Sequence, residues 1–165
     1  MDHKLFDHIT TFIFDVDGVF TNSEVIVMEN GDLVRTMNTR DGQAVKLALQ
    51  AGYHVAIITK GFSEGVRRRF QLLGIQHIYD RLDEKSQAFD DLVSTLNLKK
   101  EEILFMGDDI PDLVLYNKVG ISSCPSDAAT ENLQTAQYIC AKEGGKGCVR
   151  EVIEKVMRQQ GKWNF

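Results

Sequence analysis

The sequence predicts an α/β fold, a doubly wound and mostly parallel sheet that carries one inserted β-hairpin. Short apolar runs of strand composition alternate with amphipathic, helix-like segments along most of the chain, which is the pattern of repeated β–α units. Two of the apolar runs end in glycine and clustered aspartates, at the kind of position where open α/β sheets place their chemistry. An asparagine–glycine turn between two β-type runs interrupts the alternation once.

The expected elements follow one another without a linker or low-complexity tract, so we expect one domain over residues 1–165. Continuous apolar runs predict buried strands at 12–14, 55–58, 103–106, 120–123 and 138–140. Apolar residues at helical spacing predict helices after the 38–42 segment and at 62–73, 87–96, 113–118, 131–135 and 149–160. Gly74 is expected to end the helix that begins near residue 62.

The first acidic strand end lies in residues 12–21, where an apolar run leads to Asp15, Asp17 and Gly18. Strand alternation predicts that the two carboxylates point to one side, and the glycine lets the backbone turn sharply. Two neighbouring buried acids repel each other and lose hydration, so they are unfavourable unless a cation or a reaction requires them. A surface Asp-x-Asp-Gly turn is the simpler alternative for this tetrapeptide alone.

The second acidic strand end lies in residues 103–112, where another apolar run leads to Gly107 and to Asp108, Asp109 and Asp112. Two acidic strand ends in one domain can converge on a hard cation such as Mg²⁺, which prefers oxygen ligands. Capping of the following helix by Asp109 or Asp112 is an alternative for those two residues, but it does not explain why both strands end in acids.

Two weaker candidates lie between the acidic ends. Thr59 ends the apolar run 55–58 with a hydroxyl that could bind an anion, although threonine is common at strand ends. Lys85 follows a turn-like segment, 79–84, and opens an expected helix. Most lysines at such positions are simply solvated, so neither residue is informative alone.

In this order, the aspartate pair, the strand-end threonine, the lysine and the glycine–aspartate–aspartate run resemble the haloacid dehalogenase superfamily. The resemblance implies that Asp15 is the nucleophile and that Asp17 is the general acid and base. It also implies that Thr59 and Lys85 hold the transferring phosphoryl group. A Mg²⁺ site would form from Asp15, Asp17 and Asp108.

The same resemblance gives Asp109 and Asp112 supporting roles around the metal site. It favours phosphoryl transfer to water over dehalogenation, because the dehalogenases of the superfamily lack the second aspartate, here Asp17. The expected reaction passes through an aspartyl-phosphate on Asp15, which divides one difficult displacement into two. Asp17 would protonate the leaving oxygen and then deprotonate the attacking water.

The inserted hairpin is expected within about residues 23–38, with β-type runs at 24–28 and 33–37 around a turn at 29–32. Such a hairpin cannot bury its own apolar residues, which are Val25, Val27, Leu33 and Met37. It therefore has to pack either on its own domain or on another copy of the chain.

The chain has no room for a cap domain between Asp17 and Thr59 or between Lys85 and Asp108, and so resembles the capless subfamily, whose members are tetramers. Within it, the chain most resembles the phosphatases of an eight-carbon keto-acid sugar phosphate used for lipopolysaccharide. This resemblance rests on the segments 15–19, 38–42, 107–112 and 144–151. It implies a homotetramer in which the hairpin, segment 144–147 or the tail 163–165 lies beside a neighbour's site.

The chain departs from that subfamily after Thr59, where such phosphatases have a glycine and then an arginine that meets the substrate carboxylate. Here Lys60 and Gly61 follow, and a lysine cannot reproduce a bidentate arginine–carboxylate pair. We expect the substrate to be bound by residues around this point, namely Lys60, Gly61, Arg67 and Asp41. Two alternatives stay open: a phosphatase for a nine-carbon keto-acid 9-phosphate or another sugar phosphate, and an inactive oligomerisation module associated with a sugar nucleotidyltransferase.

Composition restricts the remaining function classes. The net charge of −5 at pH 7, without a basic face, argues against nucleic acid as a partner, and no run is long enough to span a membrane. Three cysteines without metal-type spacing indicate reduced, buried thiols. The polar first residues lack a signal peptide's apolar core, so a cytoplasmic location is expected.

Overall fold

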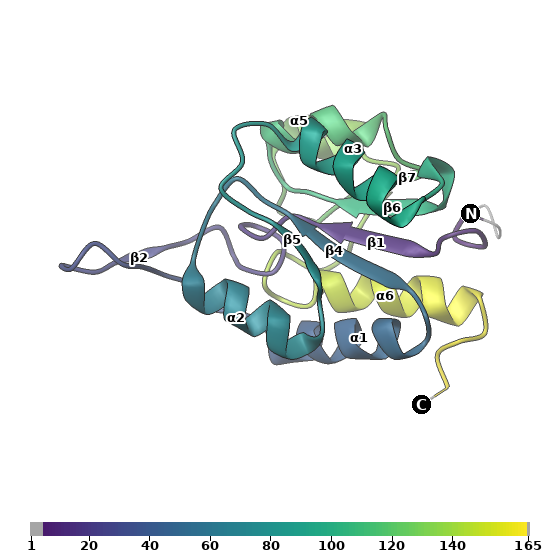
Figure 1. Ribbon diagram of the computed structural model, residues 1–165, viewed down its shortest axis with the longest axis horizontal. Coiled ribbons are helices and arrows are strands. Elements are labelled where there is room, and N and C mark those ends of the chain that lie inside the picture. The colour runs from purple at the N-terminus through teal and green to yellow at the C-terminus, as the bar shows by residue number, and fades with distance from the viewer. Residues whose placement is uncertain (1–4, 165) are drawn as a thin grey trace.

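The computed structural model describes residues 5–164, and the expected roles of Phe165 and of the first four residues lie outside that range. A six-stranded sheet forms the centre of the molecule, with the strand order β5-β4-β1-β6-β7-β8 (Figure 1). Every neighbouring pair in this sheet is parallel. Its strands are β1 (Thr11–Phe14), β4 (His54–Ile58), β5 (His77–Tyr79), β6 (Ile103–Met106), β7 (Ile121–Cys124) and β8 (Tyr138–Ile139).

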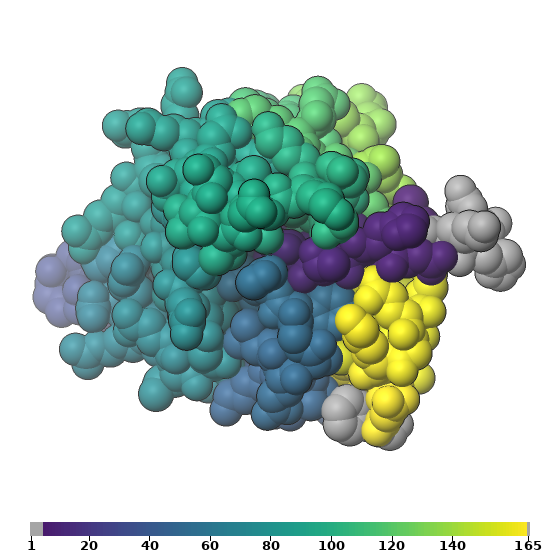
Figure 2. All heavy atoms as spheres, turned by 45° about the vertical axis from the view of Figure 1, so that its right-hand side comes forward, coloured from purple at the N-terminus to yellow at the C-terminus, as the bar shows by residue number. Residues whose placement is uncertain are grey.

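Helices cover both faces of the sheet, as the doubly wound prediction requires (Figure 1). One layer holds α1 (Thr39–Gln50), α2 (Glu64–Leu73) and α6 (Cys148–Gln159). The other holds α3 (Lys85–Leu96), α4 (Leu113–Tyr116) and α5 (Thr130–Thr135), with short 3₁₀ turns η1 (Lys100–Glu102) and η2 (Ile110–Asp112). In Figure 2 the purple N-terminal segment runs between these two layers.

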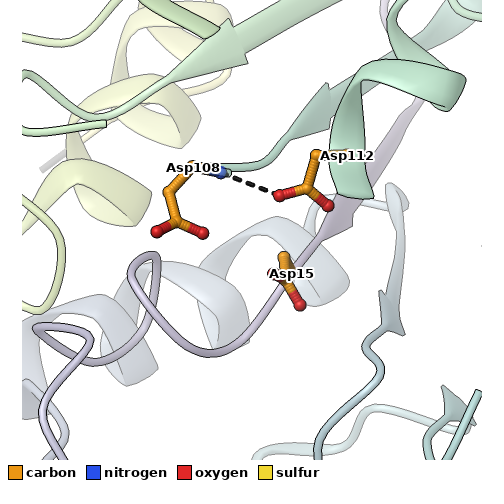
Figure 3. A group of neighbouring side chains, drawn as sticks. All are labelled: Asp15, Asp108 and Asp112. Atoms are coloured by element: carbon orange, nitrogen blue, oxygen red, sulfur yellow. Dashed lines mark hydrogen bonds between the residues drawn. The ribbon is translucent and has the colours of Figure 1, made fainter. Parts of the chain in front are cut away.

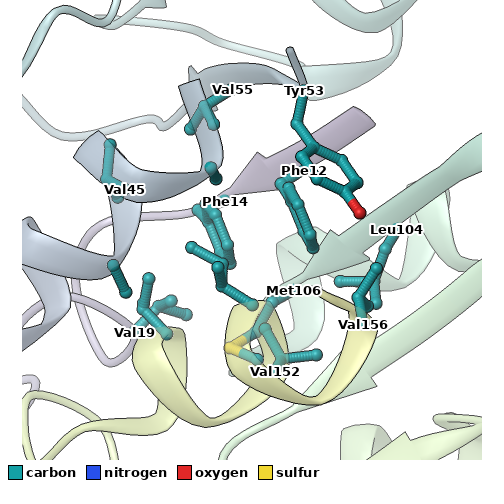
Figure 4. Packing of buried hydrophobic residues seen from close by; sticks show 14 of the residues in the cluster. Phe12, Phe14, Val19, Val45, Tyr53, Val55, Leu104, Met106, Val152 and Val156 are labelled. Atoms are coloured by element: carbon teal, nitrogen blue, oxygen red, sulfur yellow. The ribbon is translucent and has the colours of Figure 1, made fainter. Parts of the chain in front are cut away.

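Alternation along the central strands divides the core into two apolar clusters, one on each face. Phe12 and Phe14 of β1 belong to the cluster under α1 and α6, whereas Ile13 belongs to the cluster under α3 and α4. Leu104 and Met106 of β6 join the first cluster in the same way (Figure 4). Because both faces of these strands are buried, their sequences are continuously apolar instead of alternating.

The predicted strands and helices are present with small shifts at their ends, and two differences have clear causes. The three-residue strand β5 was not predicted, because it lies in a segment that the turn signals of residues 79–84 dominate. The strand β1 ends at Phe14, and the backbone N–H groups of Val19 and Phe20 bond back to the Val16 carbonyl. Strand alternation therefore stops before Asp17. Gly74 ends α2 in the left-handed conformation, with φ 97°, as expected.

The hairpin forms at the predicted turn but is shorter than predicted. Its strands are β2 (Ile26–Val27) and β3 (Leu33–Val34), and they pair only with each other. The turn between them uses Gly31 at φ 88°. Every residue from 23 to 34 is exposed, and Figure 1 shows the hairpin projecting away from the sheet. The alternative that it packs on its own domain is therefore wrong for Val25, Val27 and Leu33, whereas Met37 packs against the core of its own chain.

Two segments expected to reach a neighbouring site instead pack on their own chain. A Cβ at Gly144 would lie 2.0 Å from the Gly18 carbonyl oxygen, and the Gly145 N–H donates to the Val19 carbonyl at 2.9 Å. Segment 144–147 thus supports the loop that follows β1. Trp163 is buried, with its ring 5.4 Å from the Arg150 guanidinium of α6.

The remaining composition-based expectations concern the thiols and the membrane. Cys124, Cys140 and Cys148 are free and buried, and burial raises the pKa of the Cys124 thiol to about 11. Within residues 5–164, no helix combines the length and the apolar character needed to cross a bilayer.

Candidate active site

The two acidic strand ends meet at the middle of the sheet. Strands β1 and β6 are neighbours, with Phe14 opposite Met106, and the Asp15 N–H donates to the Met106 carbonyl at 2.9 Å. Because the strands are parallel, their carboxyl ends open on the same edge. Figure 3 shows the side chains of Asp15, Asp108 and Asp112 gathered at this edge. The convergence predicted from the sequence is therefore present.

Asp15, Asp108 and Asp112 form a carboxylate cluster that fits a hard cation. Each can offer one oxygen such that the three oxygens lie within 4.8 Å of one another. Burial and then the negative charge of Asp112 raise the pKa of Asp15 to about 6. Burial and then the charge of Asp15 raise the pKa of Asp108 to about 7. Acids in such surroundings are stabilised by a bound divalent cation, and an all-oxygen donor set suits Mg²⁺.

Lys85 supplies a buried positive charge beside this cluster. It is the first residue of α3, its side chain is 2% exposed, and its Nζ lies 3.0 Å from Asp15 Oδ1 and 2.5 Å from Asp112 Oδ1. Burial by itself would lower the pKa of Lys85, but the two carboxylates outweigh it and raise the pKa. The Lys85 ammonium is the ion-pair partner of Asp15 Oδ1, and no other described residue forms a hydrogen bond to this buried oxygen.

Asp112 organises the loop after β6. Its Oδ2 accepts the backbone N–H groups of Asp108 and Asp109 at 2.9 and 3.2 Å, while Oδ1 accepts Lys85. Both oxygens are thus engaged within the protein, which supports a positioning role for Asp112, in keeping with the sequence expectation. A Cβ at Gly107 would lie 2.3 Å from Asp112 Cγ, so only glycine allows this packing. Asp109 is exposed and caps η2.

Gly18 is a second glycine beside the carboxylate cluster at which a side chain is excluded. Its φ is 78°, and a Cβ there would lie 1.9 Å from Asp108 Oδ2. Ser23, which no motif in the sequence distinguishes, donates its hydroxyl to the same oxygen at 3.3 Å. The loop after β1 and the loop after β6 therefore fit together around the Asp108 carboxylate.

Asp17 pairs with an arginine that the sequence analysis missed. Arg35 Nε donates to Asp17 Oδ1 at 2.6 Å, and Nη2 donates to Oδ2 at 3.1 Å. Arg35 directly follows the exposed hairpin, and no motif distinguishes it in the sequence. Strand β1 ends at Phe14, before both aspartates, and the side chains of Asp15 and Asp17 line one pocket.

This pocket has a volume of about 260 Å³ and is open to the solvent. It brings together most of the residues selected from the sequence, namely Asp15, Asp17, Thr59, Lys60, Gly61, Lys85, Asp108, Asp109 and Asp112. Thr59 is buried and directly follows β4, and Lys60 is exposed at the rim.

The two remaining candidates lie elsewhere. Arg67 lines an adjoining cavity that also includes Asp17, Thr59 and Gly61, and its guanidinium pairs with Asp80 at 2.5 Å. Asp41 is fully buried and accepts the backbone N–H of Arg150 at 2.8 Å. The structure therefore does not bring Asp41 into the pocket, because it is occupied with the first turn of α6.

Comparison with known proteins was made for sequence and for structure. No protein-family model matches the chain. The 3-deoxy-D-manno-octulosonate 8-phosphate phosphatase KdsC of Escherichia coli (strain K12) is 36% identical over 156 residues, which are 94% of this chain and 83% of the relative. The KdsC proteins of Salmonella typhi and Yersinia pestis are 36% and 32% identical, again over 94% of this chain.

Solved structures give the same result. The 3-deoxy-D-manno-octulosonate 8-phosphate phosphatase of Moraxella catarrhalis was solved with a magnesium ion, a phosphate ion and a KDO molecule. It superposes with a TM-score of 0.93 at 31% identity, covering 98% of this chain and 92% of that one. A putative HAD superfamily (subfamily III A) hydrolase of Legionella pneumophila gives a TM-score of 0.94 at 34% identity, covering 97% and 88%. The chain belongs to the 3-deoxy-D-manno-octulosonate 8-phosphate phosphatase family of the haloacid dehalogenase superfamily.

Proposed function

We propose that this protein is a Mg²⁺-dependent phosphatase that hydrolyses 3-deoxy-D-manno-octulosonate 8-phosphate to the free sugar acid and phosphate. The observation that carries the proposal is the buried cluster of Asp15, Asp108 and Asp112 with Lys85, at the edge of the sheet where two parallel strands end. Its relatives act on this ester by name, and the product side of such a reaction is represented by the phosphate and KDO of the Moraxella catarrhalis structure.

In the first half-reaction, Asp15 attacks the phosphorus and Asp17 gives a proton to the leaving sugar oxygen. A carboxylate that approaches a phosphate ester must overcome charge repulsion. Lys85 lowers that repulsion, because its buried ammonium lies 3.0 Å from Asp15. The hydroxyl of Thr59 is available to bind a phosphoryl oxygen.

In the second half-reaction, Asp17 takes a proton from the water that attacks the aspartyl-phosphate, and Asp15 is released. Asp15 and Asp108 would hold Mg²⁺ through carboxylate oxygens and Asp17 through its backbone carbonyl, with Asp112 and Lys85 fixing the surrounding loop. When bound, Mg²⁺ supplies charge neutralisation on the phosphoryl oxygens.

The competing functions are less well supported. The nine-carbon ester shares the chemistry, and the Thr59–Gly61 segment lacks the expected arginine, but the sequence relatives act on the eight-carbon ester by name. An inactive oligomerisation module would have no need of buried acids whose pKa values are raised to about 6 and about 7. The intact cluster therefore favours an enzyme.

The function is tested by phosphate release from the eight- and nine-carbon keto-acid esters, compared by kcat/KM with Mg²⁺ present. We expect the eight-carbon ester to be preferred. Asp15→Asn should abolish turnover, since an amide does not attack phosphorus at a useful rate, whereas the exposed Asp7→Asn should behave as wild type. Mg²⁺-dependent turnover by purified Asp15→Asn would remove Asp15 from the nucleophile role.

We also propose that the protein works as a homotetramer in the cytoplasm. The support is the hairpin, whose apolar side chains are 42–70% exposed in the described part of the chain; they are Val25, Ile26, Val27, Met28, Leu33 and Val34. A solvent-exposed apolar hairpin of this kind is stable only when it is covered, and copies related by closed symmetry can cover one another.

A further inference from the structure

Arg35 is the feature of the site that neither motif nor spacing identified. Residues 23–34 of the hairpin are all exposed, but the Arg35 side chain is only 6% exposed and lies between the hairpin and the catalytic loop. An arginine side chain is seldom buried to this extent without a specific partner. Its partner is the carboxylate of Asp17, whose side chain is 38% exposed.

The contact between the two side chains is bidentate. Nε and Nη2 of Arg35 each bind one carboxylate oxygen of Asp17, at 2.6 and 3.1 Å, and Nη1 donates to the Leu33 carbonyl at 3.1 Å. Such a planar pair fixes the direction of a carboxylate, which a lysine cannot do. Each Asp17 oxygen keeps a lone pair that Arg35 does not use, so the carboxylate can still meet a substrate oxygen or a water.

No other described residue forms a hydrogen bond to the Asp17 carboxylate. The surroundings also leave room for the pair: a Cβ at Gly61 would lie 2.9 Å from Asp17 Oδ2 and 3.7 Å from Arg35 Nη2. The absence of a side chain at Gly61 thus lets the arginine occupy this side of the pocket. Asp17 follows the end of β1, where strand geometry no longer controls it, and its direction therefore depends on Arg35.

We propose that Arg35 is a positioning residue for Asp17: it holds this carboxylate in the direction needed for proton transfer at the leaving oxygen. The inference rests on the proposed phosphatase function and adds to it a role for the hairpin, which brings Arg35 to the site from a segment outside the sheet. It requires no particular sugar as substrate.

The test uses two aryl esters that differ in leaving group, phenyl phosphate and p-nitrophenyl phosphate, with Mg²⁺ at saturation. Nitrophenolate leaves readily without a proton, whereas phenolate depends more on a general acid. We expect Arg35→Met to lower kcat/KM for phenyl phosphate by about 10- to 100-fold, within the range that general acid catalysis contributes. For p-nitrophenyl phosphate the loss should be under about threefold, on the same reasoning.

A double-mutant cycle then shows whether Arg35 acts through Asp17. In an Asp17→Asn background, Arg35→Met should cause little further loss on either ester. Arg35→Lys, which keeps the charge but loses the bidentate contact, should show the same selective loss on phenyl phosphate. Arg68→Met is the matched control, because this arginine is 74% exposed on α2 and pairs only with Glu64; it should leave both rates unchanged.

Three results would overturn the inference: equal losses on both esters, an undiminished loss in the Asp17→Asn background, or full activity of Arg35→Lys. Thermal unfolding of each variant checks that the fold is intact, and if Arg35→Met does not fold, Arg35→Lys carries the test alone. Failure of the wild type to release phosphate from both the aryl esters and the octulosonate ester would instead refute the proposed function. A wild type active on aryl esters but not on the octulosonate ester would refute only the substrate assignment.

Discussion

Asp15 and Asp41 are both buried aspartates with a raised pKa, yet they face different surroundings. Asp15 faces the pocket, with Lys85 3.0 Å away. Asp41 faces the backbone at the start of α6, where Arg150 donates its N–H, and its Oδ2 has no hydrogen-bond partner among the described residues. A raised pKa therefore indicates a functional group only when the group also lies in a pocket.

The raised pKa of Asp41 predicts how the stability of the fold depends on pH. Burial raises its pKa from 3.8 to about 6, so between these values the folded chain keeps a proton that the unfolded chain releases. Raising the pH from about 4 to about 6 should therefore lower the free energy of unfolding, and the full decrease is reached above about pH 6. Asp41→Asn cannot ionise and should gain stability relative to wild type as pH rises from 4 to 7, by up to roughly 3 kcal/mol. Urea unfolding at several pH values measures this difference.

The raised pKa values of Asp15 and Asp108 also lower the stability of the metal-free protein as the pH rises. The difference between Asp41→Asn and wild type, measured at each pH, isolates the effect of Asp41. If the two proteins showed parallel pH profiles, Asp41 would be ionised in the fold at an ordinary pKa.

At the scale of elements, the site depends on the loops after β1 and β6, which pack closely because glycines lie at their contact points. Gly18, at φ 78°, lies against the Asp108 carboxylate, and Gly107 lies against the Asp112 carboxylate. The sequence supports a sharp turn at each of these glycines, but it does not show which carboxylate fills the space beside them. That pairing follows from the adjacency of β1 and β6.

Gly18 and Gly52 provide a matched pair for testing this interlocking. Both have positive φ, at 78° and 87°, so an alanine at either position brings a similar backbone strain of about 1 kcal/mol. A Cβ at Gly18 would also lie 1.9 Å from Asp108 Oδ2, whereas a Cβ at Gly52 would lie in open space. We expect Gly18→Ala to raise the Mg²⁺ concentration for half-maximal activity by about tenfold or more, because an oxygen ligand is displaced.

Gly52→Ala should lower the melting temperature by a similar amount to Gly18→Ala while leaving the Mg²⁺ dependence unchanged. Equal Mg²⁺ titration curves for the two variants would mean that Asp108 is not held against Gly18 in the working enzyme.

At the scale of the whole molecule, the single chain leaves its site open and its hairpin exposed. A site open to water weakens its own electrostatics and holds a polar sugar loosely. Residues 5–164 include no cap domain, and segment 144–147 and Trp163 pack on their own chain. The hairpin is thus the element that remains available to close a neighbouring site.

The corresponding prediction concerns assembly and specificity together. Replacing Val25, Val27 and Leu33 by serine removes apolar side chains that are 42–70% exposed in the chain. It should break the tetramer and reduce kcat/KM on the octulosonate ester more than on p-nitrophenyl phosphate, which needs fewer contacts. Light scattering measures the assembly. Leu72→Ser, at an apolar residue that is 76% exposed on α2, should change neither property, and a fully active wild-type monomer would contradict the prediction.

The sequence by itself determined the fold class, the acidic strand ends and the hairpin turn. These features are local, because a buried parallel strand is continuously apolar and a turn with positive φ prefers glycine. Asp15, Asp108, Asp112 and Lys85 were identified because their residue types follow such local patterns in a known order.

Tertiary structure alone decided which other residues contact the predicted acidic strand ends. Arg35 reaches Asp17 across 18 residues of sequence, and Ser23 reaches Asp108 across 85, contacts that no periodicity encodes. Asp41, which belongs to the 38–42 segment, is buried and accepts a hydrogen bond from the backbone of α6. The physical reason is that a side chain's environment depends on the elements packed around it. Which distant residues come into contact is decided by the order of the strands and the packing of the whole sheet, and not by the adjacent residues in the sequence.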